Sequence, residues 1–152
     1  MENIILNINK IDQIDEVMDV ANLVFKPNKE EKEKYHKKED WLNKIKNGLL
    51  ISASVDNKIV GFAICYQKEK DLHIWNVGVL EKYRRFGIWK KIYDEIVKFA
   101  LMNKFESISL NTYKEKFLGM YTFVIKNGFD EYKTEFDEMQ GTTKSMFKKM
   151  VK

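Results

Sequence analysis

Residues 72–91, LHIWNVGVLEKYRRFGIWKK, decide how this chain is organised. A β-prone apolar run over Ile74–Leu80 gives way to a charged break at 81–85, which predicts a strand that ends near the start of that break. From Ile88 onward, apolar residues recur at the spacing of a helix packed on a sheet. We therefore expect a strand, a short basic turn and a long helix that begins near Gly87.

The turn between this strand and this helix favours an anionic ligand. The first turn of a helix leaves backbone N–H groups unpaired and carries the positive end of the helix dipole. Gly87 would let the backbone approach a phosphate closely, and Arg84, Arg85, Lys90 and Lys91 add positive charge. The alternative is an ordinary strand-to-helix loop with a solvated basic edge, because short glycine motifs often match by chance.

The order of these residues resembles the acetyl-CoA signature of the GNAT family of N-acetyltransferases, (Arg/Gln)-x-x-Gly-x-(Gly/Ala). Arg84 and Gly87 match it, and residues 126–129, KNGF, resemble the family's Lys-x-Gly-Phe ending. Two positions depart from the pattern. Trp89 replaces the last small residue, so its indole would point away, cover the cofactor or weaken its binding. Val124 stands where the family usually has the tyrosine that acts as general acid.

The resemblance implies an acetyl-CoA site on the strand and the turn after it. In the family this strand splays from its neighbour at a bulge, which we expect within 75–78, and its free backbone groups hold the pantetheine arm and stabilise the oxyanion. Asn111 and Thr112 stand where the family places a polar side chain against the pantetheine, although either could cap the next helix instead. The expected cofactor-binding residues are Val77, Gly78, Val79, Arg84, Arg85, Phe86, Gly87, Ile88, Trp89, Lys90, Asn111 and Thr112.

Acetyl transfer to an amine also needs a base and an acid. The family often carries a glutamate eleven residues before the arginine of the signature, and that position is His73 here. An imidazole with an ordinary pKa near ~6.5 could take the proton directly or through a water. The alternative is a histidine that is hydrogen-bonded at the sheet surface. Tyr121, one helical turn before Val124, is the nearest replacement acid unless it merely packs on the sheet.

The lysine- and glutamate-rich segment 26–48 has the pattern of an exposed helical connection that Gly48 would end. In the resembled family this connection forms a wall of the acceptor site. Candidate substrate contacts are therefore Tyr35, His36, Trp41 and, on the strand, Trp75, although His36 lies in the charged connection and is expected to face solvent instead.

The remaining pattern predicts a mixed, mostly antiparallel sheet of six or seven strands with helices on both faces, which is also the GNAT order. We expect one domain over residues 1–152. Strands are expected at 3–8, 49–55, 58–66, 72–80, 107–110, 129–136 and 144–151, with a hairpin turn at Asp56-Asn57, and helices at 14–25, 88–100 and 114–126.

Composition narrows the class of protein. The chain has 152 residues, of which 44% are hydrophobic and 33% charged, and its net charge of +4 comes from interleaved lysines and acids that favour a solvated surface over a nucleic-acid groove. Cys65 is the single cysteine, so we expect no internal disulfide, no zinc site and a reducing, cytoplasmic setting. The N-terminal residues lack signal-peptide character, and no apolar run has the length of a membrane span.

The sequence thus predicts an acetyltransferase that passes an acetyl group from acetyl-CoA directly to a primary amine of a small molecule or a protein, without a metal. The alternative is a non-catalytic CoA-binding or regulatory module of the same fold, because a fold does not fix an activity. We expect no nucleic-acid or membrane partner, and homodimerisation through a sheet edge stays open.

Overall fold

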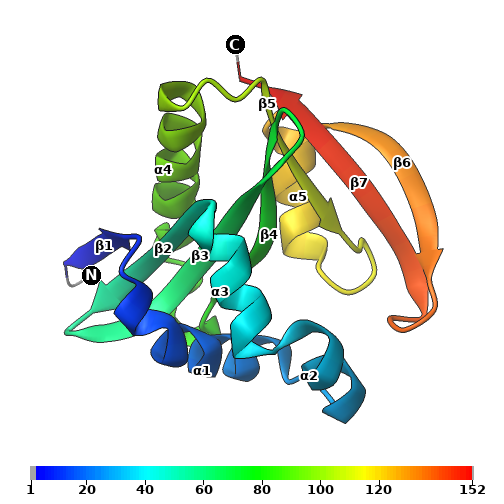
Figure 1. Cartoon of the computed structure of the whole chain (residues 1–152). Helices are drawn as coiled ribbons and strands as arrows, with labels where there is room; N and C mark the ends of the chain where they lie inside the picture. The colour runs from blue at the N-terminus through cyan, green and yellow to red at the C-terminus, as the bar shows by residue number, and fades with distance from the viewer. Residues whose placement is uncertain (1–2, 152) are drawn as a thin grey trace.

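The computed structural model describes residues 3–151; residues 1, 2 and 152 of the expected domain lie outside the described residues. Seven strands form one sheet in the order β1-β2-β3-β4-β5-β7-β6 (Figure 1). Neighbouring strands are antiparallel except β4 and β5, which run parallel. The predicted mixed, mostly antiparallel sheet is therefore confirmed. The strands are β1 (Ile4–Ile8), β2 (Gly48–Val55), β3 (Lys58–Lys68), β4 (Asp71–Val79), β5 (Ser107–Thr112), β6 (Asp130–Asp137) and β7 (Thr142–Met150).

Helices cover both faces of this sheet. On one face, α1 (Ile14–Phe25) and α3 (Lys38–Lys46) bury an apolar stripe against β2 and β3, with the indole of Trp41 fully enclosed. On the other, α4 (Ile88–Met102) and α5 (Leu118–Lys126) pack on the middle strands and on Phe147 of β7. The short helix α2 (Lys29–Tyr35) buries none of its residues. The core is thus two apolar layers that share the sheet.

The central strands β4 and β5 pair over only part of their length. The pairing joins Asp71–Ile74 to Ser107–Leu110 and stops there, although β4 continues to Val79. At the same point the register between β3 and β4 shifts, because Cys65 pairs with Ile74 while Ile64 pairs with Asn76. Trp75 is therefore the extra residue of a β-bulge, within the range that the sequence predicted. Beyond the bulge, the β5 side of β4 is open.

Local signals placed most element boundaries correctly. Asp56 and Asn57 both have positive φ, 52° and 64°, as a two-residue hairpin turn requires when the flanking strands have their usual right-handed twist. Gly128, at φ 78°, follows the C-terminal end of α5 as expected. The long helix begins at Ile88, directly after Gly87.

Three boundaries differ from prediction. The segment 26–48, predicted as one helical connection, contains two helices, because Asn28 and Glu31 form a capping box that starts α2 separately from α3. Gly48 is the first residue of β2 and not a helix stop; a Cβ there would lie 2.1 Å from the carbonyl oxygen of Cys65. Finally, α5 begins at Leu118 and not at 114, because the residues before it form a turn that is closed by a bond from the Phe117 N–H to the Tyr113 carbonyl.

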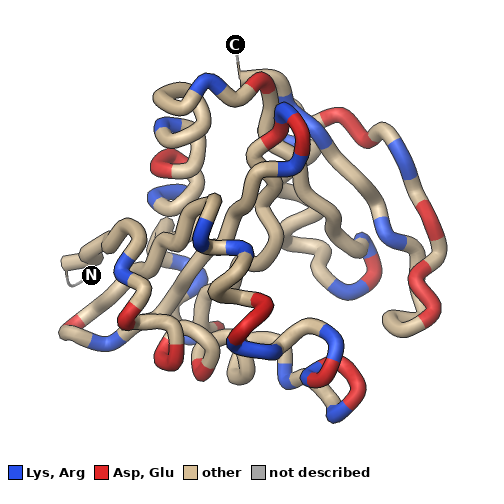
Figure 2. Tube along the Cα trace, viewed as in Figure 1, with Lys and Arg blue, Asp and Glu red and all other residues tan. Residues whose placement is uncertain are grey.

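Charged residues of both signs alternate along most of the chain (Figure 2). No helix within residues 3–151 has both the length and the apolar character needed to cross a membrane.

Candidate acetyl-CoA and acceptor site

The turn before α4 exposes a row of backbone donors. Gly87 lies in the left-handed region at φ 73°, and the first backbone bond of the helix runs from the Lys91 N–H to the Gly87 carbonyl. Among residues 3–151, the N–H groups from Arg85 to Lys90 bond to no backbone or side-chain acceptor. A Cβ on Gly87 would meet nothing within 4 Å, so the space beside this turn is open. The arrangement fits a phosphate group.

The charged side chains of this turn are positioned differently from one another. Arg84 folds back so that its Nε donates to the carbonyl oxygen of Val79 at 2.9 Å, which leaves its remaining guanidinium donors free. Arg85 and Phe86 are exposed, and Lys90 is paired with Asp94 one turn along the helix at 2.5 Å. Ile88, by contrast, is buried in the core and contributes only its backbone.

Backbone groups of β4 also point into the open side of the strand. The Leu80 N–H donates to the Val60 carbonyl on β3 at 2.8 Å. Because successive residues of a strand direct their N–H and C=O groups to opposite edges, those of Val79 and Val77 face the other edge, where β5 has diverged. Gly78 lies between them, and a Cβ at this position would come within 3.0 Å of the Phe62 ring and 3.2 Å of the Val24 side chain of α1. Of the expected cofactor-binding residues of β4, Val77 and Val79 thus present backbone groups to the unpaired strand edge, whereas those of Gly78 face β3.

Trp89 points toward α5. Its ring centroid lies 5.3 Å from that of Phe123 and 5.8 Å from that of Tyr93. The indole N–H of Trp89 and the hydroxyl of Tyr93 are both buried, with no hydrogen-bond partner in the described part of the chain. The sequence left open whether the indole points away, covers the cofactor or weakens its binding. In the structure it fills the space between α4 and α5, beside the first turn of α4.

Asn111 and Thr112 end β5 on the far side of the opening. Neither caps α5, whose N-cap position is Phe117. Thr112 is buried, and the Asn111 side-chain oxygen is buried without a partner among residues 3–151. An unpartnered buried polar atom at this point is compatible with a polar ligand in the opening.

A cavity of about 500 Å³ opens on the opposite face of the sheet, at the bulge. We call it the acceptor pocket; its lining includes Lys34, Tyr35, Asp40, Lys44, Tyr66 and Trp75. Tyr35 and Trp75, two of the candidate substrate contacts, therefore line the same pocket. Trp41 is not exposed to the pocket: it is 0% exposed, and its indole N–H donates to the Tyr35 carbonyl. Trp41 supports the wall from behind, with its ring 5.5 Å from that of Trp75.

His73 is buried behind the acceptor pocket and is not part of its lining. It is 4% exposed, its ring lies 5.3 Å from that of Tyr66, and its Nδ1 is 2.8 Å from the Ser109 hydroxyl. Burial, together with the charge of Lys68, lowers the pKa of His73 to about 4, so the ring is neutral at physiological pH. His36, expected in solvent, is instead half-buried against Trp41, and burial lowers its pKa as well.

Tyr121 lies on the other face, with its ring edge-on to Phe147 at 5.6 Å. Its hydroxyl makes no hydrogen bond within residues 3–151. Val124, one turn further on, is fully enclosed in the core between α5 and the sheet. Cys65 is likewise buried, and burial raises the pKa of its thiol, as expected for a core residue.

The contacts that join the β6–β7 turn and the segment before α5 to α1 and α2 were not predicted from the sequence. Gln140, in the β6–β7 turn, donates to Glu31 of α2 and accepts from Lys116. Phe25 at the end of α1 meets Phe117 before α5, with ring centroids 6.0 Å apart. Lys44 of α3 and Tyr66 of β3 were not named from the sequence as pocket residues. For Tyr66, the register of the hairpin that contains β3 was the only feature of the sequence that could have indicated this position.

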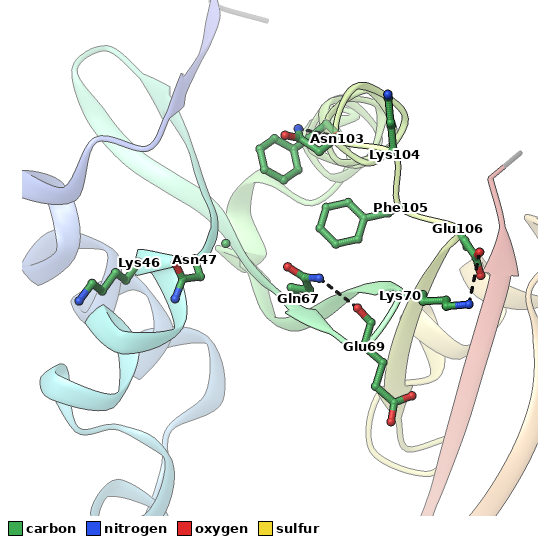
Figure 3. A pocket seen from close by; sticks show the side chains of 11 residues that line it. Lys46, Asn47, Gln67, Glu69, Lys70, Asn103, Lys104, Phe105 and Glu106 are labelled. Carbon is green, nitrogen blue, oxygen red and sulfur yellow. Dashed lines mark hydrogen bonds and ion pairs between the residues drawn. The ribbon is translucent and has the colours of Figure 1, made fainter.

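A second cavity, of about 470 Å³, lies at the other end of the sheet, between Gly48, Gln67 and the end of α4 at Asn103 (Figure 3). Lys70 and Glu106 of its lining form an ion pair at 3.9 Å, and the lining includes none of the predicted site residues. Across residues 3–151, no group of three or more His, Cys, Asp or Glu side chains is placed to hold a metal ion.

An open strand edge, a row of free N–H groups and a pocket on the opposite face together form the candidate site. The model of the acetyltransferase (GNAT) family matches residues 14–129. The chain therefore belongs to the GNAT family of acetyltransferases. A search of curated protein sequences finds no match.

Solved structures share this fold across almost their whole length. The PaiA N-acetyltransferase of Thermoplasma acidophilum, in complex with coenzyme A, matches with a TM-score of 0.81 at 20% identity, covering 97% of this chain and 99% of that one. The ribosomal-protein-S18-alanine N-acetyltransferase of Escherichia coli matches at 0.81 and 10% identity, covering 98% and 94%. An aminoglycoside 6'-N-acetyltransferase complexed with coenzyme A matches at 0.76 and 13% identity, covering 97% of both chains.

Proposed function

We propose that this protein transfers an acetyl group from acetyl-CoA directly to a primary amine. The observation that carries the proposal is the start of α4, where unbonded N–H groups from Arg85 to Lys90 lie beside the open edge of β4. Membership in the GNAT family and two neighbours with coenzyme A support it. Acetyl-CoA, when bound, supplies the acetyl group as an activated thioester.

The chain's own groups have separate tasks in this proposal. The turn from Arg85 to Lys90 binds the phosphates through backbone N–H groups, and Arg84 adds charge. The unpaired N–H groups of Val77 and Val79 orient the donor and stabilise negative charge that develops on its carbonyl oxygen. The acceptor pocket presents the amine from the opposite face, at the bulge of Trp75.

Proton transfer from the amine and to the departing thiolate is the step with the fewest suitably placed side chains. With a pKa of about 4, His73 is a weak base at neutral pH, and it is not part of the pocket lining, so we propose that it accepts a proton only through a water. Tyr121 is proposed as the donor of a proton to the departing thiolate. Profiles of kcat against pH for His73→Gln and Tyr121→Phe test both roles: loss of a titrating limb assigns the residue, and unchanged profiles leave the transfer to solvent.

Calorimetric titration with acetyl-CoA tests the donor site. Gly87→Asp places a negative charge where the phosphates would lie, and Gly119→Asp, at an exposed position of α5 with open space around it, is the matched control. We expect Gly87→Asp to weaken binding about tenfold or more and Gly119→Asp to leave it unchanged. Absence of acetyl-CoA binding by the wild type would refute the proposal.

A second candidate is a CoA-binding module without transferase activity. The buried Val124 and the indole of Trp89, at the two positions that depart from the family pattern, favour it. Release of free thiol from acetyl-CoA in the presence of a panel of amines separates the two. An enzyme accelerates release with at least one amine, whereas a module binds the donor without turnover.

A further inference from the structure

Lys44 lines the acceptor pocket and lies over two aromatic rings. Its Nζ lies 4.2 Å from the ring centroid of Tyr66 and 4.9 Å from that of Trp75. The aliphatic stem comes from α3, which Trp41 and Ile45 anchor in the core. Two aromatic rings on adjacent strands therefore hold one ammonium group in a defined position.

This ammonium has no carboxylate partner. Within residues 3–151, no Asp or Glu oxygen lies within 4 Å of the Lys44 amine. Asp40, one turn earlier on α3, lines the same pocket without forming an ion pair with it. A second cation, Lys34, lines the pocket with its Nζ 5.2 Å from the ring centroid of Tyr35. The pocket therefore offers an oriented positive charge to whatever enters.

These contacts argue against a second ammonium as the occupant. The ring faces of Tyr66 and Trp75 that would attract a cation are already taken by Lys44, and both pocket lysines repel one. They instead attract an anion, and their field favours the neutral, reactive form of a bound amine.

The basicity of the amine further narrows the class of acceptor that the pocket could take. Because the pocket lining holds no histidine, the amine has to arrive neutral or lose its proton to water. At pH 7.5, roughly a third of peptide α-amino groups with a pKa of about 7.7–8.0 are neutral, against about 0.1% of lysine side chains with a pKa of about 10.4.

Building on the proposed transferase function, we propose that the acceptor is an α-amine that carries a nearby carboxylate, and that Lys44 binds this carboxylate and determines specificity. The carboxylate belongs either to a free amino acid or to an acidic residue next to a peptide N-terminus. Both sources present a carboxylate to Lys44, but the α-amine of a peptide is less basic than that of a free amino acid and is therefore neutral to a larger extent.

Paired acceptors test the proposal through acetyl-CoA-dependent thiol release. Ala-Glu amide and Ala-Gln amide share the same α-amine and differ in one carboxylate, and free L-glutamate represents the amino-acid source. The variants are Lys44→Met, which removes the charge at similar length, Lys44→Arg, which keeps it, and Lys46→Met, an exposed control on the same helix outside the pocket lining.

We expect wild type to prefer an acidic acceptor by about tenfold or more in kcat/KM. For a peptide acceptor, Ala-Glu amide is preferred over Ala-Gln amide; for an amino-acid acceptor, free glutamate is preferred over both peptides. Lys44→Met removes the preference through KM, Lys44→Arg retains most of it, and Lys46→Met keeps all of it. Turnover of Ala-Glu amide assigns the peptide source, and turnover of glutamate alone assigns the amino acid.

Binding of the acetylated products to the protein in the presence of coenzyme A, followed by calorimetry, gives a readout without catalysis. N-acetyl-Ala-Glu amide and N-acetylglutamate are the probes, and at least one is expected to bind about tenfold more weakly to Lys44→Met. Turnover of the acidic and neutral peptides at equal rates, without a Lys44 effect, overturns the inference but leaves the transferase function intact. Faster turnover of diamines by Lys44→Met also overturns it. Failure to bind acetyl-CoA overturns both.

Discussion

The imidazole Nδ1 of His73 and the hydroxyl Oγ of Ser109 lie 2.8 Å apart between the parallel strands β4 and β5. Both side chains are buried at the last stretch where these strands pair. The contact closes the paired end of the sheet directly below the bulge at Trp75. A histidine in this place stabilises the strand junction as long as its ring stays neutral.

His73 makes stability depend on pH. Its pKa falls from 6.5 in the unfolded chain to about 4 in the folded one, so the unfolded chain binds more protons between these values. The contribution to the free energy of unfolding is complete above pH 6.5 and is lost as the pH falls toward 4. At about 1.4 kcal/mol per pH unit, the loss is about 3 kcal/mol.

Urea unfolding of wild type and His73→Gln between pH 4 and 8 measures this effect. The difference between the two curves isolates His73 from the carboxylates that titrate in the same range. A parallel pair of curves would contradict a neutral, buried His73.

Gly87 and Gly119 offer a comparison of one substitution in two conformations. Neither Cβ would meet an atom within 4 Å, but Gly87 has φ 73° while Gly119 lies within α5. Gly87→Ala should lower the free energy of unfolding by about 1 kcal/mol, because an alanine is strained in the left-handed region. Gly119→Ala should raise it by about 0.5–1 kcal/mol, because alanine favours a helix. Thermal or urea unfolding measures both, and shifts of the same sign would rule out the assigned backbone conformation of Gly87.

Gly48 tests steric contact rather than dihedral strain. A Cβ at this position would lie 2.1 Å from the carbonyl oxygen of Cys65 and 2.8 Å from that of Lys44, both backbone atoms. Gly48→Ala should therefore force β2 away from β3 and lower the free energy of unfolding by about 3 kcal/mol or more. Gly141→Ala, in an open turn, provides a comparison that involves no such clash. A Gly48→Ala protein as stable as wild type would show that the strands can separate at little cost.

Trp89→Phe should not destabilise the protein, although it removes part of a large side chain. The ring contacts with Phe123 and Tyr93 can be kept, while a buried N–H without a partner is removed. Leaving such a donor unpaired costs about 1–3 kcal/mol, so we expect stability equal to wild type or higher by about 1 kcal/mol. Urea unfolding gives the answer. A loss above 1 kcal/mol would mean that the indole packing outweighs the unpaired N–H.

Acetyl-CoA titration of Trp89→Phe adds a functional reading. If the bound donor accepts a hydrogen bond from the indole N–H, the variant binds it more weakly while remaining folded. Equal affinity would confine Trp89 to packing between α4 and α5.

The sequence was informative wherever a signal is local. The strand, basic turn and helix over residues 72–91 follow from the period of the apolar residues and from Gly87, and the structure ends the strand at Val79 and begins the helix at Ile88, each within a residue of the expected boundary. The family and the mixed sheet followed from the same segment together with KNGF at 126–129. That the protein acts in a cytoplasmic setting as a single domain stays a prediction.

Only the tertiary structure decided where side chains from separate elements meet. It buried Trp41 and His73, directed Trp89 toward α5, and set the ammonium of Lys44 over the rings of Tyr66 and Trp75. The physical reason is that apolar period and turn chemistry are properties of neighbouring residues. A side chain's surroundings depend instead on packing between α3, β3 and β4, and on a bulge whose position is set by pairing with another strand.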